Sequence, residues 1–209
     1  MKIHRLFSLM VAAALGCVPS AAPLKGVPAP DRTLPILLLP LGHRHLVFKW
    51  EYQEGEVAAR GDGSVRTAAP DSARLDFFLG GGLGAGAAVL IGDSLRSPHA
   101  ELARRYIPPS PMMWAVLGRL AIPPLPDTVV HIDGDLLRAD VGNPVQWRVG
   151  IRGDTLVELQ HISGGKITES LTRGANGVLT YEAPGARRRL ELTFLRDQPG
   201  SFDASIWGL

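Results

Sequence analysis

The stretch that decides the fold is LVFKWEY at residues 46–52, where large apolar side chains alternate with charged or smaller ones. A period of two places successive side chains on opposite faces of a β-strand. The same alternation recurs at residues 74–79, 147–152 and 190–194. These four segments predict strands with one buried face and one wetter face.

Turn signals follow the predicted strands at short intervals. Glycine beside Asp, Asn or Glu is typical of hairpin turns. Such short connections indicate antiparallel neighbours, because parallel strands need crossovers of a dozen residues or more. The predicted turns are Glu54-Gly55, Gly61-Asp62-Gly63, Gly153-Asp154, Gly164-Gly165 and Ala175-Asn176-Gly177.

The interval between residues 97 and 124 has a helical pattern instead. Ser97 and Ser110 are each followed by proline, as at a helix N-cap with proline at the first helical position. The first helix is expected to end near Tyr106. The second is expected to end before Pro123-Pro124, and its apolar residues at helical spacing are Met113, Val116, Leu117 and Leu120.

The predicted order is five strands, two short helices and six or so further strands. Open twisted sheets rarely exceed about ten strands, so this sheet has to curl or close. We therefore predict an α+β fold: a curled, open antiparallel β-barrel of about eleven strands, with a short-helix lid over an apolar cavity.

The N-terminus has the pattern of an export signal. Lys2 and Arg5 precede an apolar run at residues 6–15, which is shorter than the roughly 20 residues that cross a bilayer. The run leads to Cys17, the only cysteine of the chain. The block at residues 14–17, Ala-Leu-Gly-Cys, resembles the lipobox of bacterial lipoproteins, although alanine stands where leucine is usual.

The lipobox resemblance implies cleavage before Cys17 and acylation of that cysteine with chains such as palmitate. A plain secretory signal cut near Ala21 or Ala22 is the alternative. The proline-rich residues after Cys17 are expected to be extended and unable to pack as a helix, as suits a membrane tether. The predicted organisation is a signal peptide at 1–16, a tether at 17–41 and one folded domain at 42–209.

The charge balance argues against nucleic acid as a partner. The formal net charge of +2 comes from Lys2 and Arg5, so the part after the predicted cleavage is neutral. A neutral domain has no general attraction to phosphates. With Cys17 acylated the chain has no thiol for a disulfide, so packing has to hold the fold. No segment after the signal is apolar for long enough to span a membrane.

Several short motifs resemble chemical sites. Gly92-Asp93-Ser94-Leu95 resembles the nucleophile block of GDSL esterases, but the late Asp-x-x-His motif of that family is missing, so a strand followed by a turn is favoured. His43-Arg44-His45 and Asp133-Gly134-Asp135 lack the further ligands of a metal site. Arg187-Arg188-Arg189 is interpreted as a solvated turn. We predict no catalytic residues, metal or cofactor.

The glycine-rich segment at residues 80–86 contains one large apolar side chain, Leu83. An exposed leucine between glycines is not stabilised by water, whereas its insertion into lipid or an apolar groove lowers the free energy. Leu83 is therefore a candidate membrane-inserting residue. The alternative is that it folds back onto the sheet.

Together these features resemble the LolA/LolB lipoprotein-localisation family over roughly residues 46–207. Arg74-Leu75 and Leu83-Gly84 resemble a strand and protruding leucine loop of the outer-membrane receptor LolB. Residues 111–118 resemble its tryptophan-containing lid helix, and residues 146–149 a tryptophan-bearing strand. The N-terminal strands match poorly, the tether is longer and the loop has extra glycines.

The resemblance implies a non-enzymatic lipoprotein that binds acyl chains and accepts or inserts lipoproteins at the outer membrane, as a transport chaperone. Its expected partners are membrane lipid, other lipoproteins and a periplasmic carrier, and its expected location is the periplasmic face of the outer membrane. A structural or assembly lipoprotein of the envelope is the alternative, followed by a GDSL-type esterase. The predicted cavity or lid residues are Leu75, Phe77, Trp114, Leu117, Trp147 and Val149.

Two substitutions separate these classes. If the chain is a lipid or lipoprotein acceptor, Leu83→Glu abolishes transfer to vesicles while the circular dichroism spectrum is unchanged, because a charge resists insertion into hydrocarbon. An esterase would instead lose ester turnover in Ser94→Ala, and a structural protein would show neither effect.

Overall fold

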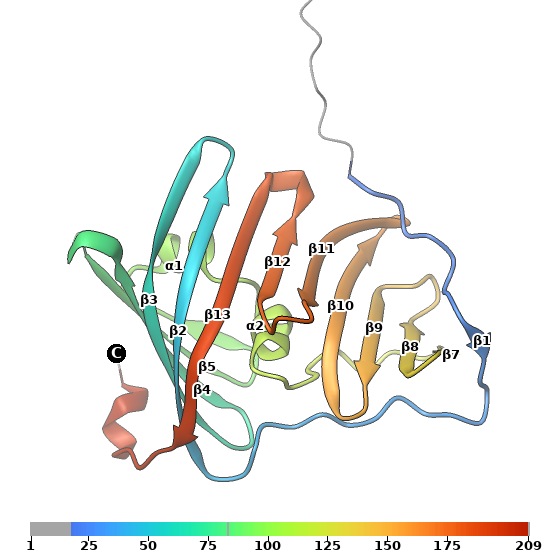
Figure 1. Ribbon diagram of the computed structural model, residues 1–209, viewed down its shortest axis with the longest axis horizontal. Helices are drawn as coiled ribbons and strands as arrows, with labels where there is room; N and C mark the ends of the chain where they lie inside the picture. Colours follow the sequence, from blue (N-terminus) through green and yellow to red (C-terminus); the bar gives the residue numbers. More distant parts are fainter. Residues whose placement is uncertain (1–17, 83, 209) are drawn as a thin grey trace, which may run out of the picture.

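The computed structural model describes residues 18–82 and 84–208, which form one curled antiparallel sheet with helices on its inner side (Figure 1). The thirteen strands found in these residues follow the order β1-β7-β8-β9-β10-β11-β12-β13-β2-β3-β4-β5-β6. The sheet is open, because its first and last strands, β1 and β6, do not pair with each other. The predicted curled, open antiparallel architecture is confirmed.

The elements follow the predicted order of strands, helices and strands. Before the helices lie β1 (Val27–Pro28), β2 (His43–Glu54), β3 (Val57–Ala68), β4 (Ser72–Leu79), β5 (Ala85–Ile91) and β6 (Ser94–Arg96). The helices are α1 (Ala100–Tyr106) and α2 (Ser110–Val116). After them come β7 (Thr128–Asp133), β8 (Leu136–Val141), β9 (Trp147–Arg152), β10 (Thr155–Ser163), β11 (Lys166–Arg173), β12 (Leu179–Ala183) and β13 (Arg188–Pro199). Single turns of 3-10 helix lie at Gly80–Gly82, Pro184–Ala186 and Ala204–Trp207.

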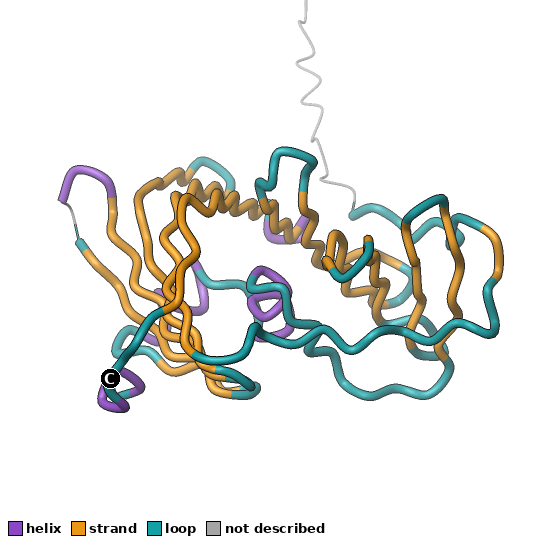
Figure 2. The backbone as a smooth tube through the Cα atoms, turned by 60° about the horizontal axis from the view of Figure 1, so that its bottom comes forward, coloured by secondary structure: helices purple, strands orange, loops and turns teal. Residues whose placement is uncertain are grey.

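Helix α2 fills the middle of the curl (Figure 2). Trp114 is completely buried, and its indole Nε1 donates a 2.7 Å hydrogen bond to the carbonyl oxygen of Gly92 at the end of β5. The Arg119 guanidinium lies 4.7 Å from the centre of the Trp114 ring. The hydrogen bond to the buried indole N–H offsets the cost of removing this group from water. Trp114 therefore fixes α2 against one wall of the sheet.

Neither helix begins where the serine-proline pairs predict, since α1 begins two residues later and α2 one residue earlier. Helix α1 starts at Ala100, because the Ser97 hydroxyl donates to the carbonyl oxygen of Ala87 at 2.8 Å. Ser110 is the first residue of α2 instead of its cap, and its hydroxyl donates to the carbonyl oxygen of Asp93 at 3.1 Å. The Ser97 hydroxyl thus bonds to strand β5, and the Ser110 hydroxyl bonds to the turn that follows β5. The second helix also ends at Val116, so the predicted extension to Leu120 is wrong.

The predicted turn at Gly61-Asp62-Gly63 is wrong, since these residues lie inside β3. In the register of β2 and β3, Gly61 is opposite Trp50 and Gly63 is opposite Phe48. A Cβ atom on Gly63 would lie 2.3 Å from the Phe48 ring. Gly63 therefore leaves room for the Phe48 ring, and Gly61 leaves room for the carbonyl oxygen of Phe78 on β4 as well as for the Trp50 ring.

The arginine run at 187–189 is only partly the solvated turn that the sequence suggests. Arg187 has a φ of 50° and forms the turn between β12 and β13. Arg188 and Arg189 lie on β13. The Arg188 guanidinium is 3.0 Å from the Glu54 carboxylate, and that of Arg189 is 2.6 Å from Glu182. These two arginines link neighbouring strands.

The segment predicted as a tether is extended, as its prolines indicate, and it lies along the sheet (Figure 1). We call its described residues, 18–41, the strap. Val27 and Pro28 form the edge strand β1 beside β7. Further along, Leu37 and Leu39 are buried in the main core, and the Leu37 carbonyl oxygen accepts a 3.1 Å hydrogen bond from the Leu120 amide. The prolines did not predict this packing.

Within residues 18–82 and 84–208, no helix is both long and apolar enough to cross a bilayer. The two residues predicted to contact membrane, Cys17 and Leu83, lie outside the described residues. In the sequence, position 83 lies between β4, which ends at the exposed Leu79, and β5.

The packing of Phe48 gives a test of the β2–β3 register. Gly63→Ala is expected to lower the free energy of unfolding by about 1–3 kcal/mol, because its methyl group would overlap a buried ring. The matched control is Gly86→Ala in β5, where a Cβ meets nothing within 4 Å and the effect should stay below about 1 kcal/mol. Urea denaturation measures both, and equal stabilities would contradict this register.

Candidate functional site

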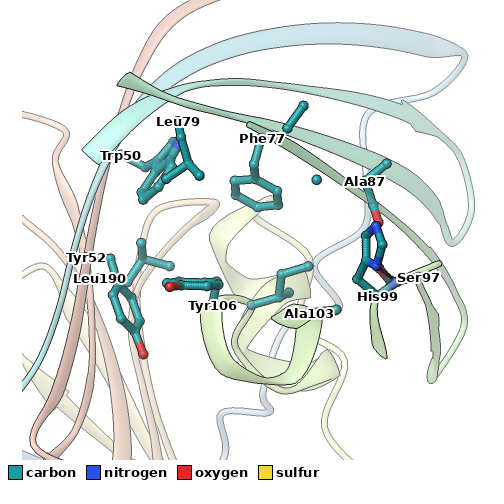
Figure 3. A pocket seen from close by; sticks show the side chains of 13 residues that line it. Trp50, Tyr52, Phe77, Leu79, Ala87, Ser97, His99, Ala103, Tyr106 and Leu190 are labelled. Carbon is teal, nitrogen blue, oxygen red and sulfur yellow. Dashed lines mark hydrogen bonds between the residues drawn. The ribbon is translucent and has the colours of Figure 1, made fainter. Parts of the chain in front are cut away.

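An apolar cavity of about 110 Å³ lies between α1 and the inner face of the sheet (Figure 3). Its lining comes from four strands and one helix, and hydrophobic side chains dominate it. From the sheet come Trp50, Tyr52, Phe77, Leu79, Ala85, Gly86, Ala87 and Leu190, and from α1 and its flanks Ser97, His99, Ala103, Tyr106 and Ile107. This volume is below the 300–1,000 Å³ of typical ligand pockets.

Aromatic rings form the upper wall of the cavity. Trp50 and Phe77 meet edge to face, with ring centres 6.1 Å apart. The Trp50 indole nitrogen donates to the carbonyl oxygen of Asp62 at 3.0 Å, so its polar end has a partner and its apolar surface faces the cavity. Phe77 also packs edge to face against Phe48 at 5.7 Å. The contacts among these rings fix the shape of the wall.

Helix α1 forms the lid of the cavity and is attached to the end of β2. The ring of Tyr106 meets that of Tyr52 edge to face, with ring centres 4.7 Å apart, and the Tyr52 hydroxyl donates to the carbonyl oxygen of Arg105 at 3.2 Å. The Arg105 side chain donates to the Glu54 carboxylate at 2.6 Å. We call the contacts of Tyr52 and Glu54 with α1 the lid latch. The rest of the lid contact is apolar, through Ala103 and Ile107.

Charge pairing stabilises the latch at neutral pH. Hydrogen bonds from Arg188 and then Arg105 lower the pKa of the Glu54 carboxyl below its ordinary value. Burial raises the pKa of the Tyr52 phenol, which keeps this hydroxyl protonated and able to donate. A carboxyl with a lowered pKa contributes stability that is present above its ordinary pKa and is lost as pH falls through the lowered one.

The sequence-predicted cavity residues fall into two groups. Phe77 lines the cavity, and it also lines a smaller void together with Leu117 at the end of α2. The other four, Leu75, Trp114, Trp147 and Val149, are buried in the main core. Their role in a cavity remains a prediction.

Sequence reasoning missed the lid residues and most of the upper wall. The alternating segments that predicted strands include Trp50, Tyr52 and Leu190. The pattern of one strand, however, does not indicate which part of its buried face other elements leave uncovered. Tyr106 was predicted only as the end of a helix. Its edge-to-face contact with Tyr52 joins residues 54 positions apart, which no local pattern encodes.

The motifs weighed as chemical sites lie in ordinary structural positions. Gly92 and Asp93 form the two-residue turn that the favoured interpretation predicted, and exposed Ser94 begins β6. His43 stacks on Phe202 at 5.4 Å. Gly134 and Asp135 connect β7 to β8. Among residues 18–82 and 84–208, no three His, Cys, Asp or Glu side chains lie where they could hold a metal ion together.

The sequence matches no protein-family model and no curated protein. Among solved structures, the chain is similar to a LolA superfamily protein from Nitrosomonas europaea, with a TM-score of 0.53 and 8% identity over 82% of this chain and 92% of that one. It also resembles an outer membrane lipoprotein-sorting protein domain from Vibrio parahaemolyticus, with a TM-score of 0.43 and 7% identity over 79% and 89% of the two chains. The match to a DUF1329 family protein from Desulfovibrio piger has a TM-score of 0.44 and 10% identity, over 80% and 90%.

The first of these similarities shows the fold. This chain shares the fold of that protein, and in this chain the fold is an open, curled antiparallel sheet with short helices on its inner side. The resemblance predicted from the sequence is confirmed at the level of fold, with sequences that have diverged to 8% identity.

The lid latch can be tested with an apolar dye that gains fluorescence in hydrophobic sites. Glu54→Ala is expected to raise the association rate of N-phenylnaphthylamine several-fold at pH 7, because α1 loses its ion pair with β2. Acidification of the unmodified protein through the lowered pKa of Glu54 should raise the rate in the same way. Stopped-flow fluorescence measures both effects.

The matched control is Glu56→Ala. Glu56 is exposed two residues away and has no hydrogen-bond or ion-pair partner within the described part of the chain. Its substitution should leave the rate unchanged. An unchanged rate in Glu54→Ala, with an unchanged circular dichroism spectrum, would show that the latch does not control access to the cavity.

Proposed function

We propose that this chain is a lipid-anchored lipoprotein of the bacterial cell envelope that holds acyl chains in the cavity beneath α1. The anchor is Cys17, and the membrane is the outer membrane, with the domain on its periplasmic side. The protein accepts the acyl chains of lipoproteins, delivered by a periplasmic carrier, and releases them to the bilayer. Leu83 inserts into that bilayer.

The observation that carries this proposal is the apolar cavity under a helix that a few contacts hold in place. The apolar surface of the cavity is formed by side chains such as Trp50, Phe77 and Leu190. An acyl chain bound there would be stabilised by about 0.8 kcal/mol for each methylene removed from water. The cavity of about 110 Å³ is too small for a whole acyl chain, so α1 moves outward when a chain binds.

Transfer of this kind requires no bond to be made or broken. Movement of an acyl chain from one apolar site to another depends on the difference between two affinities. A lined cavity and a movable lid are therefore sufficient. The alternative of a structural envelope protein gains support from the dense packing around Trp114 and Val149, which fills the rest of the inner face.

Native mass spectrometry of the full chain, released from detergent, tests the proposal. We expect lipid to remain bound to the unmodified protein and to be lost in Ala87→Phe, whose ring would occupy the cavity. Ala175→Phe is the control, because Ala175 is exposed in the turn between β11 and β12. A protein that carries no lipid even after incubation with excess phospholipid would favour the structural alternative.

A further inference from the structure

The start of the described chain is attached to one end of the sheet. The Ala21 amide donates a 2.9 Å hydrogen bond to the carbonyl oxygen of Gly165, and the Ile167 amide donates one of 2.9 Å to the carbonyl oxygen of Pro19. Val18 lies beside Gly185. Residue 18 is therefore fixed between the β10–β11 and β12–β13 turns.

These turns belong to the same end of the sheet. In an antiparallel sheet, alternate turns lie at opposite ends. The β2–β3 turn lies there too, since the Gly55 amide donates to the carbonyl oxygen of Arg187 at 3.2 Å. We call this the tip end, and it carries the connections at residues 55–56, 80–82, 142–146, 164–165 and 184–187 (Figure 1).

The cavity lies toward the tip end. Tyr52, two residues before the end of β2, and Leu79, the last residue of β4, both line it, as do Ala85 and Gly86 at the start of β5. The latch residue Glu54 is the last residue of β2. The lid contacts and the outer part of the cavity are thus close to the turns beside which the strap begins.

The two ends of the sheet differ in charge. At the tip end, Glu56 and Arg187 are the charged residues of the hairpin turns, and their charges cancel. The hairpin turns of the opposite end carry four aspartates and no basic residue: Asp71, Asp93, Asp135 and Asp154. Of these, Asp135 pairs with exposed Arg152 at 2.7 Å. An anionic bilayer surface repels these turn aspartates, and Arg152 and Arg173 at the adjoining strand ends offset only part of their charge.

We propose that the strap orients the domain on the membrane, with the tip end against the bilayer surface and the acidic end away from it. This inference rests on the proposed acylation of Cys17, which precedes Val18 directly in the sequence. The strap acts as a short, fixed attachment in place of a free spacer. The cavity then faces the lipid from which chains are taken or to which they are released.

Because Cys17 is the only cysteine, its acylation leaves an introduced cysteine as the unique thiol for labelling. Ala186 and Ala175 are exposed alanines in the turns at the two ends of β12, separated by about 17 Å of strand. The lipidated full chain is reconstituted in vesicles of phosphatidylcholine and phosphatidylglycerol. Ala186→Cys and Ala175→Cys are each labelled with a fluorophore, and spin-labelled headgroups in the vesicles act as quencher.

We expect strong quenching at position 186 and little at position 175. Equal quenching, or stronger quenching at 175, would overturn the orientation. A second form of the protein carries 20 Gly/Ser residues between Cys17 and Val18, which reach about 25 Å and leave every strap contact intact. The difference between the two labels should then shrink at least several-fold. If the full difference persists, the strap does not set the orientation.

The proposed function and this inference fail in different ways. If Cys17 is not acylated, the protein does not bind the vesicles at all, and the proposed function loses its anchor. If the protein binds vesicles and retains lipid in native mass spectrometry but both labels are quenched equally, only the orientation is wrong.

Discussion

The inner face of this sheet is apolar, and the described strands do not close on themselves to bury it. Leaving such a face in water would cost roughly 25 cal/mol for each Å² exposed, so other parts of the chain have to cover it. Helix α2 covers the middle through Trp114, and the strap inserts Leu37 and Leu39. Helix α1 covers the remainder with Tyr106 and the small Ala103, and these two side chains leave the cavity unfilled.

Much of this architecture is encoded in local sequence, because alternation at positions 46–52 already fixes which face of β2 is buried. Errors arose where a distant partner decides the outcome. Gly61 and Gly63 give the same local signal in a turn as in a strand that faces large rings, and only Trp50 and Phe48 on β2 distinguish the two cases. Likewise, Ser97 resembles a helix cap, but its hydroxyl bonds to Ala87 on β5.

The candidate site was harder to predict than the fold for the same reason. A cavity is the part of a core that packing leaves unfilled, so its position depends on how the covers meet the sheet. Phe77 was identified because it lies on a strand with clear alternation. Tyr106 and Tyr52 were not, because their contact depends on where the α1 lid crosses β2. The prolines of the strap likewise predict that it is extended, but they do not predict which part of the sheet it packs against.

The lid latch bears on the direction of the proposed transfer. Bilayer hydrocarbon and the cavity both remove methylene groups from water, so the gain of about 0.8 kcal/mol per methylene is nearly equal in both and cannot drive transfer by itself. The contacts between α1 and β2 exist only when the lid is closed. In the proposed transfer, an acyl chain in the cavity would break these contacts, and its departure would restore the pairing of Arg105 with Glu54. Closure of the lid therefore favours release, and an orientation with the tip end at the bilayer would direct the released chain into lipid.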